Sequence, residues 1–136
     1  MRTSTIPAEA PAFERAYPGT ASQPRHVRAD LAAVADGCPA AESLLLLASE
    51  LATNAILHSR SGHPERTFTV RATLSPGAYA RVEVEDQGGP WTPGEHDVER
   101  GRGLAIVAAV AGDGNWGIEG DAVCRVAWFR LDWQQS

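Results

Sequence analysis

The chain is organised around residues 44–59, LLLLASELATNAILHS. As a helix, this stretch places Glu50, Asn54 and His58 four residues apart and therefore along one face. An apolar stripe at helical spacing runs along the opposite side: Leu44, Leu47, Leu51 and Ala55 or Ile56. This amphipathic pattern predicts a helix that buries one side in the core.

Glu50 and Asn54 combine a carboxylate and a carboxamide one helical turn apart, which suits a divalent metal ion and its water. An amide oxygen can ligate Mg²⁺ without adding charge, and a carboxylate can orient or deprotonate a nucleophile. A solvated polar edge on a buried helix explains the same pattern without any chemistry. This stretch alone leaves both interpretations open.

Length and composition indicate a single soluble domain. The 136 residues suffice for a hydrophobic core, and contents of 43% hydrophobic and 21% charged residues are ordinary. The net charge of -5 and the lack of a basic run argue against a general nucleic-acid surface. No apolar run is long enough to span a membrane, and the N-terminus lacks a signal-peptide core. We therefore expect a cytoplasmic protein.

The two cysteines, Cys38 and Cys124, are far apart and form no metal-binding spacing. Two reduced thiols in a cytoplasmic protein are the simplest account of them. A single disulfide remains an open alternative.

Hydrophobic periodicity and turn residues divide the chain into short elements. The expected strands are 12–17, 67–74, 79–85, 115–119 and 123–133, and the expected helices are 22–36, 39–58 and 104–111. Residues 67–85 predict a hairpin, and Ser22 is the expected N-cap of the first helix. The last helix, apolar nearly all round, is expected to be deeply buried. This order predicts an α+β, two-layer sandwich with helices on one face of the sheet.

Two further segments have the composition of ligand-binding loops. Asp86 ends a predicted strand and precedes Gly88, so its carboxylate can accept a hydrogen bond from an exocyclic amino group. Residues 101–103, Gly-Arg-Gly, precede a helix whose N-terminal N–H groups could bind phosphate. A common hairpin-exit turn and a flexible glycine loop are the structural alternatives.

With these three motifs in order, the chain resembles the GHKL ATP-binding fold shared by histidine kinases and gyrase. Within it, the chain is similar to the small bacterial anti-sigma factor serine/threonine kinases. The resemblance covers Phe13 to Leu131 and includes an N-box, SELATNAILHS, a G1 box, DQGGP, and a G2 box, GRGLAIV. It implies a Bergerat-type sandwich with a mostly antiparallel mixed sheet, residues 12–133, after a flexible arm, residues 1–11.

The resemblance also implies ATP and Mg²⁺ as cofactors and assigns roles to residues. Glu50 would be the general base, Asn54 the Mg²⁺ ligand, Asp86 the partner of the adenine amino group, and Gly88 the residue that admits the ring. Residues 87–100 would form a lid over the nucleotide. The phosphates would be held by Gly101, Arg102, Gly103 and Leu104. His58 matches a position often occupied by histidine, although interaction with the helix dipole explains it equally well.

The chain departs from the family pattern in two places. Many members carry a Gly-Thr pair before the last strand that helps bind adenine, and this chain has Cys124-Arg125-Val126 there. It also lacks a phosphoacceptor-histidine helix pair, so a conventional sensor histidine kinase is not expected.

Two functions remain open at this point. The first is an anti-sigma factor regulator that transfers the ATP γ-phosphate to a Ser or Thr of an anti-anti-sigma (STAS-type) protein and binds a sigma factor. The second is an ATP-binding regulatory module with little or no kinase activity. The resemblance implies partner docking on the first helix around Arg25, Arg28 and Asp30, and a homodimer. It implies no direct contact with nucleic acid or membrane.

Overall fold

The computed structural model describes residues 13–58, 66–75, 78–87, 105–112, 114–120 and 124–132. In chain order the elements are β1 (Phe13–Pro18), α1 (Gln23–Val34), α2 (Ala41–His58), β2 (Thr67–Ser75), β3 (Tyr79–Asp86), β4 (Trp116–Gly120) and β5 (Arg125–Asp132). Residues 105–111 form a further helix between β3 and β4. The predicted order of elements is confirmed, with boundaries that shift by a few residues. The predicted arm, residues 1–11, lies outside the described residues.

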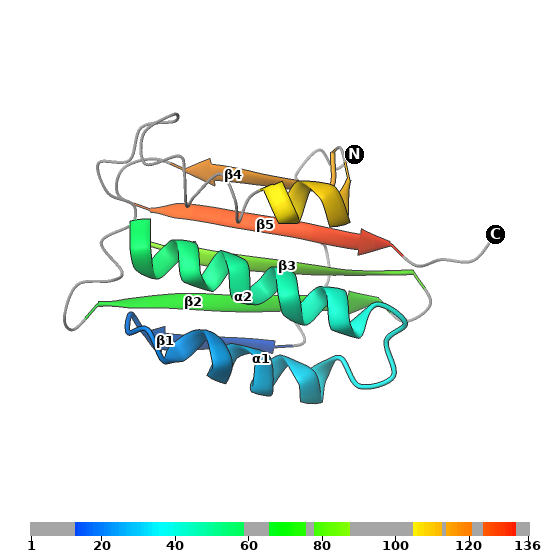
Figure 1. Cartoon of the computed structure of the whole chain (residues 1–136), viewed down its shortest axis with the longest axis horizontal. Helices are drawn as coiled ribbons and strands as arrows, with labels where there is room; N and C mark the ends of the chain where they lie inside the picture. The colour runs from blue at the N-terminus through cyan, green and yellow to red at the C-terminus, as the bar shows by residue number, and fades with distance from the viewer. Residues whose placement is uncertain are drawn as a thin grey trace, which may run out of the picture.

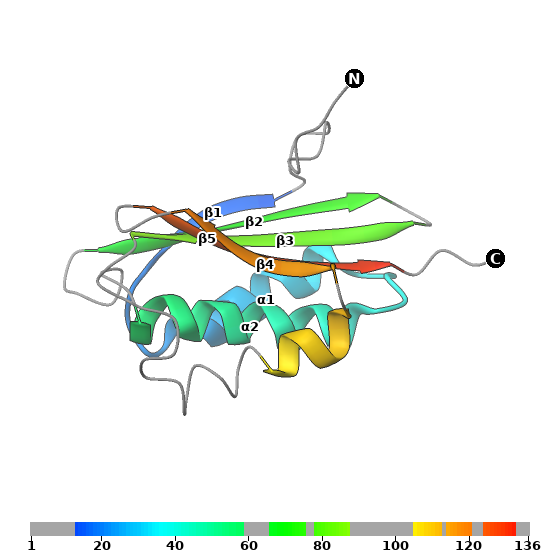
Figure 2. The ribbon, with the colours of Figure 1, turned by 90° about the horizontal axis from the view of Figure 1, so that it is seen from above.

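The described strands form one five-stranded sheet in the order β1-β2-β3-β5-β4, and every pairing is antiparallel. Figure 1 shows α1 and α2 side by side in front of the sheet, and Figure 2 shows all helices on the same face. The predicted two-layer α+β sandwich is therefore confirmed. The predicted hairpin is β2–β3, which closes at the pair Ser75–Tyr79.

The core lies between the sheet and α2. Leu44, Leu47, Leu51 and Ala55 of α2 are at most 1% exposed, whereas Ile56 is half-buried. The predicted apolar stripe is confirmed, and Ala55 occupies its last position. Every second residue of the sheet faces these side chains: Phe68, Val70, Ala72, Ala80, Val82, Val84, Ala127, Phe129 and Leu131. Alternation with period two thus places one sheet face in the core, as expected for a sheet covered on one side.

The first helix is anchored to the sheet by a polar cluster. Asp30 accepts hydrogen bonds from the Tyr17 hydroxyl at 2.7 Å and from Arg15 at 3.0 Å. Burial and the bond to Asp30 raise the pKa of Tyr17, so its hydroxyl stays protonated. Ser22 is at the N-cap position of α1, as predicted, but its side chain makes no capping hydrogen bond.

The expected deep burial of the helix over residues 105–111 is wrong. Val107 is fully buried, but Ala109 is exposed and Val110 is 42% exposed. Figure 1 shows this helix over β4 and β5, away from α2. In a two-layer fold only one side of a helix meets the sheet, so an all-round apolar sequence still leaves an exposed face.

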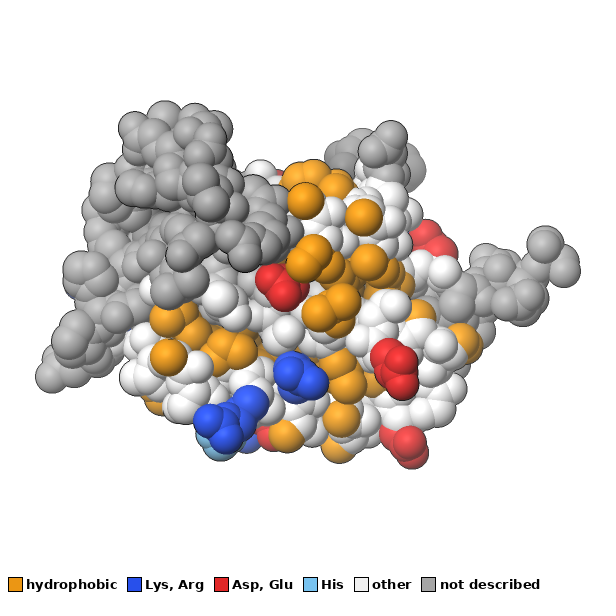
Figure 3. Space-filling view, in the orientation of Figure 1, with side chains coloured by type: hydrophobic (Ala, Val, Ile, Leu, Met, Phe, Trp, Pro, Cys, Tyr) orange, Lys and Arg blue, Asp and Glu red, His pale blue; other side chains and the backbone are white. Residues whose placement is uncertain are grey.

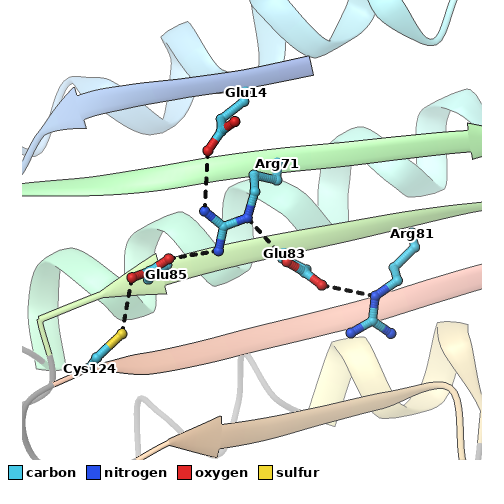
Figure 4. Close-up of polar contacts among 6 residues, drawn as sticks. All are labelled: Glu14, Arg71, Arg81, Glu83, Glu85 and Cys124. Carbon is cyan, nitrogen blue, oxygen red and sulfur yellow. Dashed lines mark hydrogen bonds and ion pairs between the residues drawn. The ribbon is translucent and has the colours of Figure 1, made fainter. Parts of the chain in front are cut away.

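Charged side chains form a connected network on the sheet face opposite the helices (Figure 4). Arg71 lies at its centre and contacts Glu14, Glu83 and Glu85 at 3.5, 3.2 and 2.7 Å. Burial alone would lower the pKa of Arg71, but the bonds to Glu85 and Glu83 outweigh it and raise the pKa. The Cys124 thiol also donates to Glu85, at 3.0 Å.

The network predicts acid sensitivity that depends on Glu85. Hydrogen bonds from Cys124 and then Arg71 lower the pKa of Glu85 below its ordinary value of 4.5. A lowered folded-state pKa stabilises the fold above the ordinary value, and this contribution is lost as the pH falls through the folded value. We expect Glu85→Gln to flatten the acid limb of stability, measured by urea unfolding at neutral and acidic pH. The exposed Glu119, changed to Gln, is the control, and equal acid limbs in both variants would contradict the prediction.

The turn after β4 requires glycine. Gly120 has φ +115°, and a Cβ atom there would lie 2.2 Å from the Cys124 carbonyl oxygen and 2.8 Å from the Arg125 Cα. These are backbone atoms that a rotamer change cannot move. Gly37 also has a positive φ, +87°, but no atom lies within 4 Å of its Cβ position.

We expect Gly120→Ala to destabilise the fold by about 2–5 kcal/mol, from the backbone conformation plus overpacking. Gly37→Ala should lose only the conformational part, about 1–2 kcal/mol. Urea unfolding of both variants measures the difference. Equal losses of stability would show that the backbone contact at Gly120 relaxes freely.

Candidate functional site

Three elements bring the candidate site together at one end of the molecule. The C-terminal end of α2, the end of β3 and the start of β5 lie at the same end in Figures 1 and 2. The helix packs directly on β3 and β5. Polar residues from separate parts of the chain therefore meet at the edge of a buried apolar layer.

Glu50 and Asn54 lie on the flank of α2, beside its buried stripe. Both are half-buried, while their chain neighbours Leu51 and Ala55 are at most 1% exposed. The helix is continuous from Ala41 to His58, so the two polar residues are one turn, about 6 Å of rise, apart. Their predicted shared face is confirmed. His58 ends the helix, but its side chain lies outside the described residues.

Asp86 ends β3 on the sheet face that meets the helices, and its side chain is 6% exposed. Its cross-strand partner is Arg125, the first residue of β5. The Arg125 Nε atom lies 3.5 Å from the Asp86 Oδ1 atom, and the arginine side chain is 9% exposed. Burying either charge alone would be strongly unfavourable, so the two side chains stabilise each other at this position.

Sequence reasoning did not identify Arg125 as the partner of Asp86. The signal was available in the alternation of β5, since Arg125 shares its parity with the core residues Ala127, Phe129 and Leu131. This parity places the guanidinium on the inner face of the sheet.

Comparison with known proteins assigns this arrangement to a family. Residues 15–126 match the family described as the histidine kinase-like ATPase domain. The chain belongs to that family. The matched range covers most of the chain and contains every candidate site residue, which confirms the resemblance to the GHKL fold. No curated protein matches the chain.

Family membership supports ATP binding by this ATPase domain. Its described residues fit a nucleotide, because a buried carboxylate lies at the end of β3 and a carboxamide and carboxylate lie on the flank of α2. Among the described residues, no three His, Cys, Asp or Glu side chains are grouped as a metal site. A magnesium ion here would take most of its ligands from nucleotide phosphates and water, as is usual for Mg²⁺.

The remaining candidate residues of the ATPase domain stay predictions. Gly88, Gly101, Arg102, Gly103 and Leu104 lie outside the described residues. Of the predicted lid, residues 87–100, the structure describes only Gln87, which accepts a hydrogen bond from Arg66 at 2.8 Å. Within the described ranges, no helix is long and apolar enough to cross a membrane.

Proposed function

We propose that this ATPase domain is an ATP-dependent serine/threonine protein kinase that acts as an anti-sigma factor regulator in the cytoplasm. Its substrate is a serine or threonine of an anti-anti-sigma, STAS-type protein. The observation that carries the proposal is the placement of Glu50 and Asn54 on one accessible flank of α2, at the end of the molecule that holds Asp86. A pure nucleotide-binding site has no need of a carboxylate one turn from the metal ligand.

Each residue has a separate task in this mechanism. Asp86 accepts a hydrogen bond from the adenine amino group, and Asn54 ligates Mg²⁺. Bound MgATP supplies the phosphoryl group and the charge neutralisation that phosphoryl transfer requires. Glu50 takes the proton of the substrate hydroxyl as its oxygen bonds to the γ-phosphorus and the bond to the bridging oxygen of ADP breaks.

The test supplies MgATP and a STAS-type protein to the full chain. We expect phosphate on one Ser or Thr of the STAS-type protein, located by mass spectrometry. ATP binding without any transfer would contradict the kinase and favour the regulatory module with little or no kinase activity. One observation favours that alternative, namely that Arg125 stands where many family members have the Gly-Thr pair.

The partner surface of the proposal is α1. Arg25, His26 and Arg28 are exposed on it, and Figure 3 shows the basic side chains at the lower edge of the helix face. Asp30, also predicted to lie on the docking face, is half-buried and bonded to Arg15 and Tyr17. The exposed charge on this surface is therefore basic, which suits an acidic face of a sigma factor.

We expect Arg28→Glu to weaken sigma-factor binding about tenfold, because it reverses a charge at the contact. Arg130→Glu changes the net charge equally but lies on the sheet face opposite the helices, so it should bind normally. Surface plasmon resonance at two salt concentrations measures both variants. An equal loss in both would point to a general charge effect, and no loss in either would exclude α1 as the docking element.

A further inference from the structure

Asp86, Arg125 and Gly120 form one row across three strands. Asp86 pairs with Arg125 between β3 and β5, and Gly120 pairs with Arg125 between β4 and β5. Residues directly opposite in antiparallel strands share a face, so this row lies on the inner, helix-covered face. The row holds an acidic and a basic side chain next to each other, with no side chain on the β4 side.

The next row inward on the same face is apolar. It consists of Val84, Ala127 and Ile118, which are the cross-strand partners one pair further along the strands. Val84 is 1% and Ala127 is 7% exposed, and Ile118 is half-buried. A planar aromatic ring that contacts this apolar row would meet the Asp86–Arg125 pair at its edge.

The buried pair presents two complementary groups to such a ring. The carboxylate of Asp86 accepts hydrogen bonds, and the guanidinium of Arg125 carries five N–H donors in a planar fork. Their contact joins one nitrogen, Nε, to one oxygen, Oδ1. Adenine has the matching pattern, because its 6-amino donor is flanked by the ring acceptors N1 and N7.

We propose that Arg125 is a second residue that reads the base. Its guanidinium donates a hydrogen bond to the ring nitrogen next to the 6-amino group, while Asp86 accepts one from that amino group. This inference rests on the adenine contact proposed for Asp86. It makes Arg125 a specificity-determining residue and accounts for an arginine at a strand position whose neighbours on that face are apolar.

A purely structural role for Arg125 makes a different prediction. If the guanidinium only holds the Asp86 carboxylate in place, removing it weakens all adenine nucleotides by the same factor. If it contacts a ring nitrogen, removing it matters only for nucleotides that have that nitrogen. Base analogues therefore separate the two roles.

Calorimetry with ADP, 1-deaza-ADP, 7-deaza-ADP and purine riboside diphosphate, which lacks the amino group, tests the proposal. We expect one of the two deaza analogues to bind the parent chain about tenfold more weakly than ADP. In Arg125→Met this difference should vanish, while the weaker binding of the amino-free nucleotide persists. Arg125→Lys keeps the charge beside Asp86 and should lose part of the difference.

Each failure has its own meaning. Equal binding of ADP and both deaza analogues to the parent chain would overturn the role of Arg125, and this result needs no variant to fold. A uniform loss in Arg125→Met would also overturn it in favour of a positioning role. A folded parent chain that binds no ADP would overturn the proposed nucleotide function, and the present inference with it.

Discussion

Glu50→Gln should lower the rate of phosphoryl transfer about 100- to 10,000-fold, the usual contribution of a general base. Glutamine has nearly the size of glutamate but cannot take the proton of the substrate hydroxyl. Because Glu50 is half-buried on the flank of α2 and not in the core, the fold should tolerate the change. Binding of MgATP should therefore be little changed, and the variant separates catalysis from binding.

The measurement is single-turnover phosphorylation of the STAS-type protein, with ATP affinity determined by calorimetry on the same samples. Glu42→Gln is the matched control, since Glu42 is exposed in the first turn of the same helix. The control should transfer phosphate at the parent rate. A Glu50→Gln variant as fast as this control would show that another group takes the proton.

Asp86→Ala should have two effects, because Asp86 is both the proposed adenine contact and the partner of Arg125. Loss of a charge-assisted hydrogen bond should weaken ATP binding about 10- to 150-fold. Loss of one partner of a buried ion pair should also destabilise the fold by about 3–5 kcal/mol. Both side chains of the pair are at most 9% exposed, so water replaces little of the lost interaction.

Asp86→Asn distinguishes the two effects. The amide retains the size and a carbonyl acceptor, so its loss of stability should be smaller than that of alanine, while ATP binding remains weakened. The exposed Asp36, changed to Ala, should alter neither property. Calorimetry and urea unfolding are the measurements, and an Asp86→Ala variant that binds ATP like the parent would exclude Asp86 from the base site.

Much of the fold follows from local patterns in the sequence. The period-two alternation of Val70, Ala72 and their neighbours predicted the β2–β3 hairpin, which the register confirms. The 3.6-residue period of Leu44, Leu47 and Leu51 predicted the buried side of α2. Such patterns are reliable because side-chain direction within a helix or strand depends only on the element itself.

Local patterns failed where a second layer decides the outcome. Apolarity all around the helix over residues 105–111 predicted deep burial, yet Val110 is exposed because the sheet covers only one side. Similarly, Asp30 was expected on an outer face with Arg25 and Arg28, but it turns toward Tyr17 and Arg15 of β1. In both cases the decisive neighbour belongs to another element, which periodicity does not reveal.

The sequence by itself determined the type and order of the elements, the buried side of α2 and the placement of Glu50 and Asn54 on one helix face. Only the tertiary structure decided that β5 lies between β3 and β4, and hence that Arg125 is opposite Asp86. The physical reason is range. Helical and strand periodicity acts between residues a few positions apart, whereas the neighbour of a strand depends on how distant segments share one core.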